Sequence, residues 1–398
     1  MIDPDPYEND PFFKRIFDGT WNACIGVQGH GENYMDGYIE AAIELADAII
    51  EKELFGKRDT LVLPILYNAR HALELSLKFA DDRLIQAGVL KDDGRKLSHN
   101  IRDYWNHLHE GAVGDESLRK TIEDLRPYID SLSQIDNDGQ ELRYHQNRDD
   151  DPSLRNYAIA NLKLIRSSLH KLQKLLTALK YRTLEFVDER STGSFTNRCS
   201  RTDLMTIAKL LPKRDAWMSD EFDEIKSQVN ERFGFGNKQF SVALDQIQKS
   251  REMNAVLGVE TPLLYLTDDD VVFVIEEWRR IHPAHQPDDE GLDYFDPRRF
   301  EGMKESSNKR KAALEAIEAR LSPEALADLE TMFYLGRDGF YSEYYEQRVA
   351  ATLREHEATN APTVEILNLL EKTNLLPCVQ AAAVKLGRLL LAERLGQM

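Results

Sequence analysis

Hydrophobic residues recur at intervals of three and four over most of the chain, which is the period of an α-helix. The clearest case runs from Pro152 to about Val187, where apolar residues alternate strictly between the two spacings. No run of alternating polar and apolar residues interrupts the helical patterns, and only 261–267 suggests a short extended piece. We therefore predict an all-α fold. Shorter helical patterns cover 36–54, 59–87, 99–110, 115–132, 201–211, 219–232, 237–256, 267–281 and much of 303–398. Ser98 and Thr267 are the expected N-caps of two of these helices, and Ser322 followed by Pro323 marks the expected start of another.

Two stretches rich in helix-breaking residues divide the chain. Residues 191–197, STGSFTN, have the composition of a linker, and 282–302 is rich in Pro, Asp and Gly. We expect an N-terminal antiparallel helical bundle over 1–190, followed by two smaller, mainly helical domains at 198–282 and 303–398. The middle domain has the helix sizes of a winged-helix-like module. Its third helix carries few basic residues, so a packing or protein-contact role is favoured over DNA binding.

A polar stripe crosses the otherwise apolar helix over residues 63–79. Five polar side chains fall within one arc of about 100° on a helical wheel: Tyr67, Arg70, His71, Glu74 and Lys78. The remaining positions are apolar, so most of this helix should be buried. The spacing pairs Glu74 with Arg70 and Lys78, each four residues away, and with His71 three away. Two interpretations stay open, a self-satisfied network that holds the bundle in register or a site for a ligand or phosphate.

The charge balance limits the partners that the chain can bind. Its 398 residues include 69 acidic and 51 basic side chains, for a formal net charge of −18. This charge repels nucleic acid at long range, so any nucleic acid must be bound at a local basic site. No apolar run is long enough to span a bilayer, and the first residues lack the pattern of a secretory signal. We therefore expect a cytoplasmic protein that makes no membrane contact.

The familiar metal and cofactor motifs are absent from the sequence. Three cysteines lie far apart and form no C-x-x-C pair: Cys24, Cys199 and Cys378. The acidic loop at 134–152 lacks the glycine and glutamate positions of an EF-hand. The residues His282, His285, Asp288 and Asp289 lie in a loop without a second ligand pair at a defined distance. The glycines at 20–35 match neither phosphate-loop fingerprint, so we predict no cofactor and no metal.

Three short motifs occur in order within the first half of the chain. They are RHALELSLK at 70–78, LSHNIRDYWNHL at 97–108 and ELRYH at 141–145, followed by the long final helix of the bundle. Through these motifs and the helix plan, residues 1–190 resemble the HEPN superfamily of helical-bundle proteins. Part of the C-terminal region, including ADLETMFYLGRDGF, is similar to an uncharacterised bacterial domain family, which implies no activity.

The HEPN resemblance implies a metal-independent ribonuclease. Many HEPN proteins are bacterial toxins or antiviral effectors whose motif is an Arg, then a polar residue, with a His after four to six intervening residues. Arg102 fits this motif with His107 and with His109, and residues seven apart share a helix face. The family carries the motif on the last long helix, where this chain offers only Arg166 and His170, too close together to fit.

In the implied enzyme, the His is the general base on the ribose 2′-hydroxyl and the Arg stabilises charge on the phosphate, in a cleft shared by a homodimer. A second form of the site would bind a nucleotide or RNA phosphate without cleavage, through residues at one end of the bundle: His71, Glu74, Lys78, His99 and Arg143. The alternative function is a non-catalytic scaffold or sensor subunit whose C-terminal helices bind a partner. Placement of the Arg and the two His in one cleft would favour the enzyme.

Overall fold

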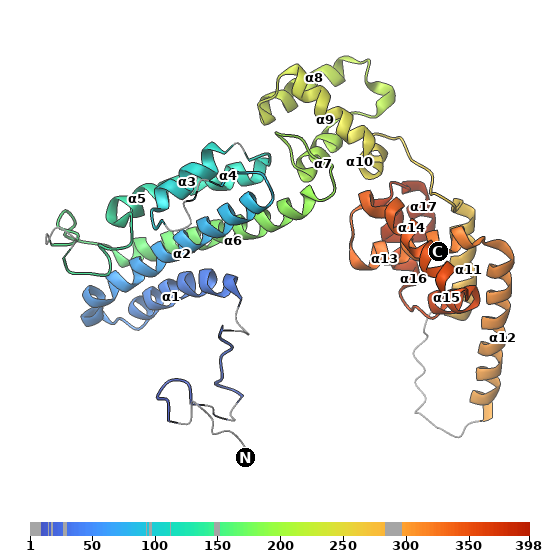
Figure 1. Ribbon diagram of the computed structural model, residues 1–398, viewed down its shortest axis with the longest axis horizontal. Coiled ribbons are helices and arrows are strands. Elements are labelled where there is room, and N and C mark those ends of the chain that lie inside the picture. Colours follow the sequence, from blue (N-terminus) through green and yellow to red (C-terminus); the bar gives the residue numbers. More distant parts are fainter. Residues whose placement is uncertain are drawn as a thin grey trace. The chain divides into compact units, whose positions relative to one another are not determined.

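The computed structural model describes residues 9–14, 16, 19–26, 30–92, 94, 98–111, 113–146, 152–282 and 297–398, and for 297–303 the backbone alone. These described residues form helices and irregular segments without a β-strand, which confirms the predicted all-α class (Figure 1). The expected extended piece at 261–267 has irregular backbone, and an isolated bridge joins Gln146 to Pro152. The chain divides into two compact units. Unit 1 is Met1–Gly111 with Lys120–Thr183, and unit 2 is Ala112–Arg119 with Leu184–Met398.

Unit 1 is built around two long helices that pack along each other. A short connection and a 3₁₀ turn join these helices, so the chain reverses between them. The second helix buries an apolar face that includes Ile65, Leu73 and Leu77, as its sequence predicts. The described helices that lie wholly or partly in unit 1 are α1 (Gly31–Glu51), α2 (Arg58–Gln86), α3 (Ile101–Glu110), α4 (Glu116–Asp124), α5 (Arg126–Asp136) and α6 (Leu162–Arg190).

Local capping explains where the observed helices differ from the predicted ones. The α6 helix begins at Leu162 rather than Pro152, because the Asn161 side chain accepts hydrogen bonds from the first backbone amides. Asn100, not Ser98, caps α3. The single helix predicted over 115–132 is two helices, because Pro127, the second residue of α5, has no amide hydrogen to continue the hydrogen bonds of α4.

Unit 2 contains shorter helices joined by tight turns. The predicted caps are confirmed: Thr267 forms a capping box with Asp270, and Ser322 caps the helix that starts at Pro323. The remaining helices are α7 (Arg201–Leu210), α8 (Asp220–Phe233), α9 (Asn237–Lys249), α10 (Arg251–Val256), α11 (Asp268–Ile281), α12 (Pro297–Arg320), α13 (Pro323–Asp338), α14 (Tyr345–Thr359), α15 (Pro362–Leu370), α16 (Leu375–Lys385) and α17 (Leu389–Gly396).

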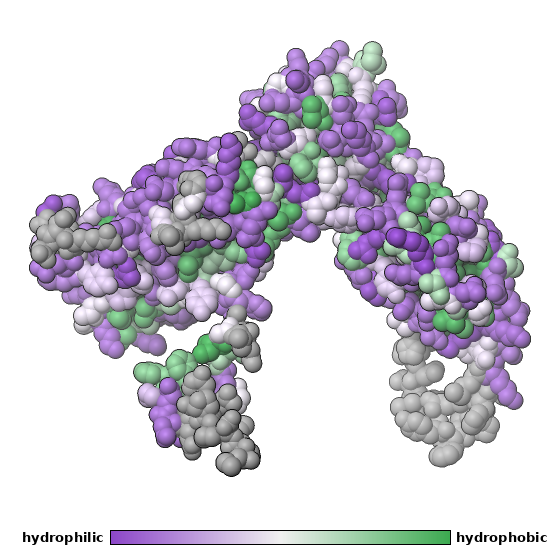
Figure 2. All heavy atoms as spheres, in the orientation of Figure 1, coloured by the Kyte–Doolittle hydropathy of each residue, from purple (hydrophilic) through white to green (hydrophobic). Residues whose placement is uncertain are grey.

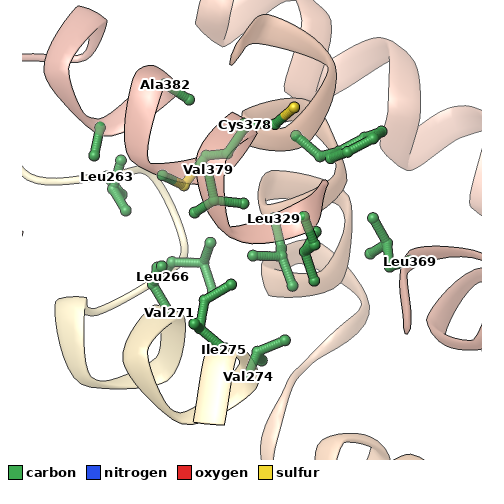
Figure 3. Close-up of a cluster of buried hydrophobic side chains, with 14 of the residues drawn as sticks. Leu263, Leu266, Val271, Val274, Ile275, Leu329, Leu369, Cys378, Val379 and Ala382 are labelled. Carbon is green, nitrogen blue, oxygen red and sulfur yellow. The ribbon is translucent and has the colours of Figure 1, made fainter. Parts of the chain in front are cut away.

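Two apolar clusters form the core of unit 2. The first gathers residues of α7 to α10, and the second gathers residues of α11 to α17. In the second cluster Leu329 of α13 lies close to Val379 of α16 and to Ile275 of α11 (Figure 3). All three side chains are buried, so α13 is enclosed by its neighbours.

The surface of the described residues is mostly polar. Figure 2 shows hydrophilic side chains over most of the visible face, with smaller apolar areas between them. None of the helices in the described part of the chain combines the length and the apolar character that a bilayer crossing requires.

Candidate functional site

Glu74 of α2 is the centre of a buried polar network. Its side chain is 2% exposed, and its two oxygens accept hydrogen bonds of 2.6 Å from Arg70 Nη1 and Lys78 Nζ. His99 Nδ1 lies 2.8 Å from Glu74 Oε1, and His71 Nδ1 lies 3.8 Å from Oε2. The structure therefore confirms the pairs that the helical spacing predicts, and it adds His99 from the segment before α3.

Arg70 connects this network to two other segments of unit 1. Its side chain is 1% exposed, with Nε donating to the carbonyl of Asp136 and Nη2 donating to the carbonyls of His99 and Asn137. Gly139 follows with a φ of +81°, and a Cβ there would lie 3.1 Å from Arg70 Nη1. Every guanidinium nitrogen of Arg70 donates a hydrogen bond within the protein, so Arg70 has a structural role and no nitrogen available for a ligand.

The hydrogen bonds keep Glu74 ionised despite its burial. Burial alone would raise the pKa of this carboxyl group. The hydrogen bonds from His71, Lys78, Arg70 and His99 outweigh burial, so the Glu74 pKa lies far below its ordinary value. The network therefore contains a permanent negative charge that orients the donors around it.

Aromatic rings extend the network toward Arg143. The His71 ring stacks on Tyr67, with centroids 5.7 Å apart, and meets Tyr38 edge-on at 4.4 Å. The Arg143 guanidinium lies over Tyr67 at 5.9 Å and over Tyr144 at 5.6 Å. Contacts thus connect all the residues predicted to bind phosphate, which we name the Glu74 cluster: His71, Glu74, Lys78, His99 and Arg143.

Charged side chains of both signs lie in and beside the Glu74 cluster. Three cations, Arg70, Lys78 and Arg143, stand against the two buried carboxylates of Glu74 and Asp136. The Asp136 carboxylate accepts hydrogen bonds from backbone amides in the following turn, which satisfy it locally. In a chain with a formal net charge of −18, these three cations gather at one place in unit 1.

Arg102, the predicted catalytic arginine, is paired with α5. Its Nη1 lies 2.9 Å from Asp130 Oδ1, and its Nη2 donates to Ser133 Oγ at 2.7 Å. His107 faces α2 instead, with Nδ1 2.5 Å from the Asp81 carboxylate, which is 1% exposed. Arg102 and His107 therefore contact two different helices.

His109, the second candidate general base, has a third set of neighbours. Its ring stacks on Trp105 with centroids 4.7 Å apart, and its Nε2 lies 3.1 Å from Glu123 and 3.2 Å from Arg126. No contact in the described residues joins Arg102 to either histidine. The structure therefore brings the predicted phosphate-binding residues together but gives the predicted catalytic residues separate partners.

An apolar groove in unit 1 was not predicted from the sequence. It has a volume of about 900 Å³ and lies between α2, α5 and α6, beside residues 157–161. Leu66, Ile135 and Leu172 are among its apolar lining residues. The sequence gives each helix an apolar face but does not show where the packed faces leave a gap.

The two loops in which the sequence predicts no metal site, 282–289 and 134–152, are described only in part. His285, Asp288 and Asp289 lie outside the described residues, as does part of the acidic loop at 134–152. His282 is described, and its Nε2 lies 2.7 Å from the carbonyl oxygen of Leu370. A backbone contact therefore accounts for this imidazole.

Comparison with known proteins adds no assignment to the site. No protein-family model, no curated protein and no solved structure matches the chain. Function must therefore be inferred from the geometry of the site.

Proposed function

We propose that this chain is a non-catalytic subunit of a bacterial defence or toxin system and that the Glu74 cluster binds a nucleotide phosphate, free or within an RNA. The observation that carries the proposal is the convergence of His71, Lys78 and His99 on one buried carboxylate. Arg143 joins them through the Tyr67 ring, which stacks on His71. The resemblance of residues 1–190 to the HEPN superfamily supplies the biological setting.

Glu74 would position the donors rather than contact the ligand. Its carboxylate occupies His99 Nδ1, so His99 Nε2 is left to face outward from a side chain that is 63% exposed. Imidazoles change charge near neutral pH, and a bound phosphate favours the protonated form. Arg143 is exposed and can offer two parallel N–H groups to phosphate oxygens.

The exposed Tyr144 ring beside Arg143 supplies a surface for a base. Tyr144 is 56% exposed, and Tyr67 stacks on His71 within the same cluster. Aromatic and guanidinium planes stack on bases with little sequence preference. This arrangement fits a ligand that carries a base next to a phosphate better than it fits inorganic phosphate alone.

The partners of Arg102 and the two histidines favour binding over cleavage. A general base must lie within hydrogen-bond reach of the proton that it removes, and the arginine must reach the same phosphate. Here Arg102 contacts α5 and His107 contacts α2. Within one chain, neither contact directs the pair at a common phosphate.

Arg143→Ala is expected to weaken binding of a fluorescently labelled RNA oligonucleotide at least tenfold, because it removes a charge-assisted phosphate contact of about 1.5–3 kcal/mol. The magnitude of the salt slope should fall by about 0.7, the value for one single-strand phosphate. Fluorescence anisotropy at several salt concentrations measures both, with unlabelled nucleotides as competitors. Arg83→Ala is the matched control, since Arg83 is also exposed and lies over an aromatic ring.

If Arg143→Ala and Arg83→Ala lost the same affinity for RNA, the loss would reflect the overall charge of the protein, and the proposed phosphate site would be contradicted. His99→Ala gives a second check, because the His99 side chain is largely exposed and its removal leaves Arg70 and Lys78 on Glu74. Wild-type protein that binds neither nucleotides nor RNA would also contradict the proposal.

The ribonuclease activity that the resemblance implies stays a prediction with its own test. If Arg102 is catalytic, Arg102→Ala abolishes RNA cleavage without changing the circular dichroism spectrum. His107→Ala and His109→Ala then differ, and only loss of the true general base lowers activity by orders of magnitude. Cleavage would persist in EDTA and leave 2′,3′-cyclic phosphate ends. Absence of cleavage by wild-type protein, alone and with candidate partners, would support the binding role.

A further inference from the structure

Three helices of unit 2 bring potential metal ligands together, far from the Glu74 cluster in sequence. Glu330 lies on α13, His356 on α14 and Glu365 on α15. One ligand atom from each residue lies within 4.8 Å of the other two. His356 Nε2 is 2.5 Å from Glu330 Oε2, a hydrogen-bond distance that shows how closely the first two side chains approach.

The two carboxylates lack a positively charged arginine or lysine partner among the described residues. Glu365 accepts only long hydrogen bonds, 3.4 Å from Thr359 Oγ1 and 3.5 Å from Asn368 Nδ2. Burial raises the pKa of Glu330, although its hydrogen bond to His356 opposes that rise. The neighbouring charge of Glu365 raises this pKa further. The protein therefore holds two acidic groups close together with one imidazole to balance them.

His356 is held in place by packing as well as by its contact with Glu330. Its side chain is 10% exposed, and its Nδ1 is buried without a hydrogen-bond partner. Such an unsatisfied buried nitrogen is rare in native proteins. Nε2 is the ring nitrogen that faces Glu330, so Nε2 rather than Nδ1 would be the metal ligand.

We propose that Glu330, His356 and Glu365 form a binding site for a divalent transition-metal cation such as Zn²⁺. One imidazole nitrogen and two carboxylate oxygens are donors that this class of ion accepts. Bonds of about 2.0–2.1 Å place the donors of a tetrahedral ion roughly 3.3 Å apart. The His356–Glu330 contact would widen and Glu365 would move inward, both by changes within the reach of side-chain rotation.

Metal binding would release the proton between His356 Nε2 and Glu330 to the solvent and would connect three helices at one point. The ion would neutralise the charge that the carboxylates leave unbalanced. Because the unfolded chain does not hold the three ligands together, binding would stabilise unit 2. A water molecule would complete a tetrahedral shell, since the protein supplies three ligands.

Titration of tag-free, full-length protein tests this site. The protein is stripped with EDTA, desalted and titrated with Zn²⁺ in a calorimeter, and Co²⁺ is added separately to record its visible absorption. We expect one equivalent of Zn²⁺ to bind, and Co²⁺ to give the absorption of a low-coordinate nitrogen and oxygen site. Glu365→Gln should weaken Zn²⁺ binding more than tenfold and abolish the Co²⁺ spectrum.

Glu357→Gln is the matched control, because Glu357 lies on α14 beside His356 but is exposed. Its removal takes away the same charge and should leave both readouts unchanged. Glu365→Gln should fold normally, since Glu365 makes only long hydrogen bonds. Failure of wild-type protein to bind either metal would overturn the proposal. So would metal binding that is equally strong in the Glu365→Gln protein, because the ion would then lie elsewhere.

Discussion

Glu74→Ala is expected to lower the free energy of unfolding of unit 1 by about 3 kcal/mol. The substitution leaves the Arg70 guanidinium 1% exposed and without its counter-charge. Carbonyl oxygens of Asp136, His99 and Asn137 would still accept its hydrogen bonds, but they carry no compensating charge. Urea denaturation followed by circular dichroism measures the change.

Glu123→Ala supplies the exposed comparison for this prediction. Glu123 of α4 also accepts two hydrogen bonds from an arginine, with its oxygens 2.7 Å from nitrogens of Arg126 at the start of α5, but the Glu123 side chain is 49% exposed. Water solvates the arginine after this substitution, so no measurable loss is expected. A loss below about 0.5 kcal/mol in Glu74→Ala would show that solvent already screens Arg70, contrary to its burial.

The helices of this protein follow from local rules that a sequence contains. Period and capping residues predicted α11 and α13 with their first residues, because Thr267 and Ser322 act on amides three positions away. The start of α6 was predicted too early because the apolar spacing continues upstream to Ala158. The Asn161 side chain caps the first turn, so the helix begins after it. A hydrophobic period alone does not distinguish a capped helix from the irregular segment before it.

Individual side-chain pairs in the candidate site were predictable where the two residues lie on one helix. The pairs of Glu74 with Arg70 and Lys78 follow from their spacing on one helix. His99 was predicted to lie near Glu74 only as one of the residues grouped at one end of the predicted bundle. The partners of Arg102 on α5 could not be foreseen, since they depend on how α3 packs against α5 and lie 28 and 31 residues from Arg102 in the chain. The Glu330, His356 and Glu365 group likewise depends on how separate helices pack, and its spacing in the sequence matches no metal-binding motif.

Gly336→Ala is expected to destabilise unit 2 severely, by about 3 kcal/mol or more. Gly336 lies in α13, and a Cβ at this position would fall 1.8 Å from the carbonyl oxygen of Cys378 in α16. The obstructing atoms belong to the backbone, so no side-chain rotation can relieve the overlap. The two helices would have to separate across the buried contact that includes Val379 and Leu329 (Figure 3).

Gly37→Ala is the control for this last prediction, because it makes the same substitution inside a helix with open space around it. Gly37 lies in α1, and no atom would come within 4 Å of its Cβ. Alanine favours the helix over glycine, so stability should rise by up to about 1 kcal/mol. Thermal unfolding of both variants should therefore show a lower unfolding temperature for Gly336→Ala and a higher one for Gly37→Ala, although the chemical change is the same. If Gly336→Ala unfolded at the wild-type temperature, α13 and α16 could not be in backbone contact at this position, and the core of unit 2 would have to be packed differently.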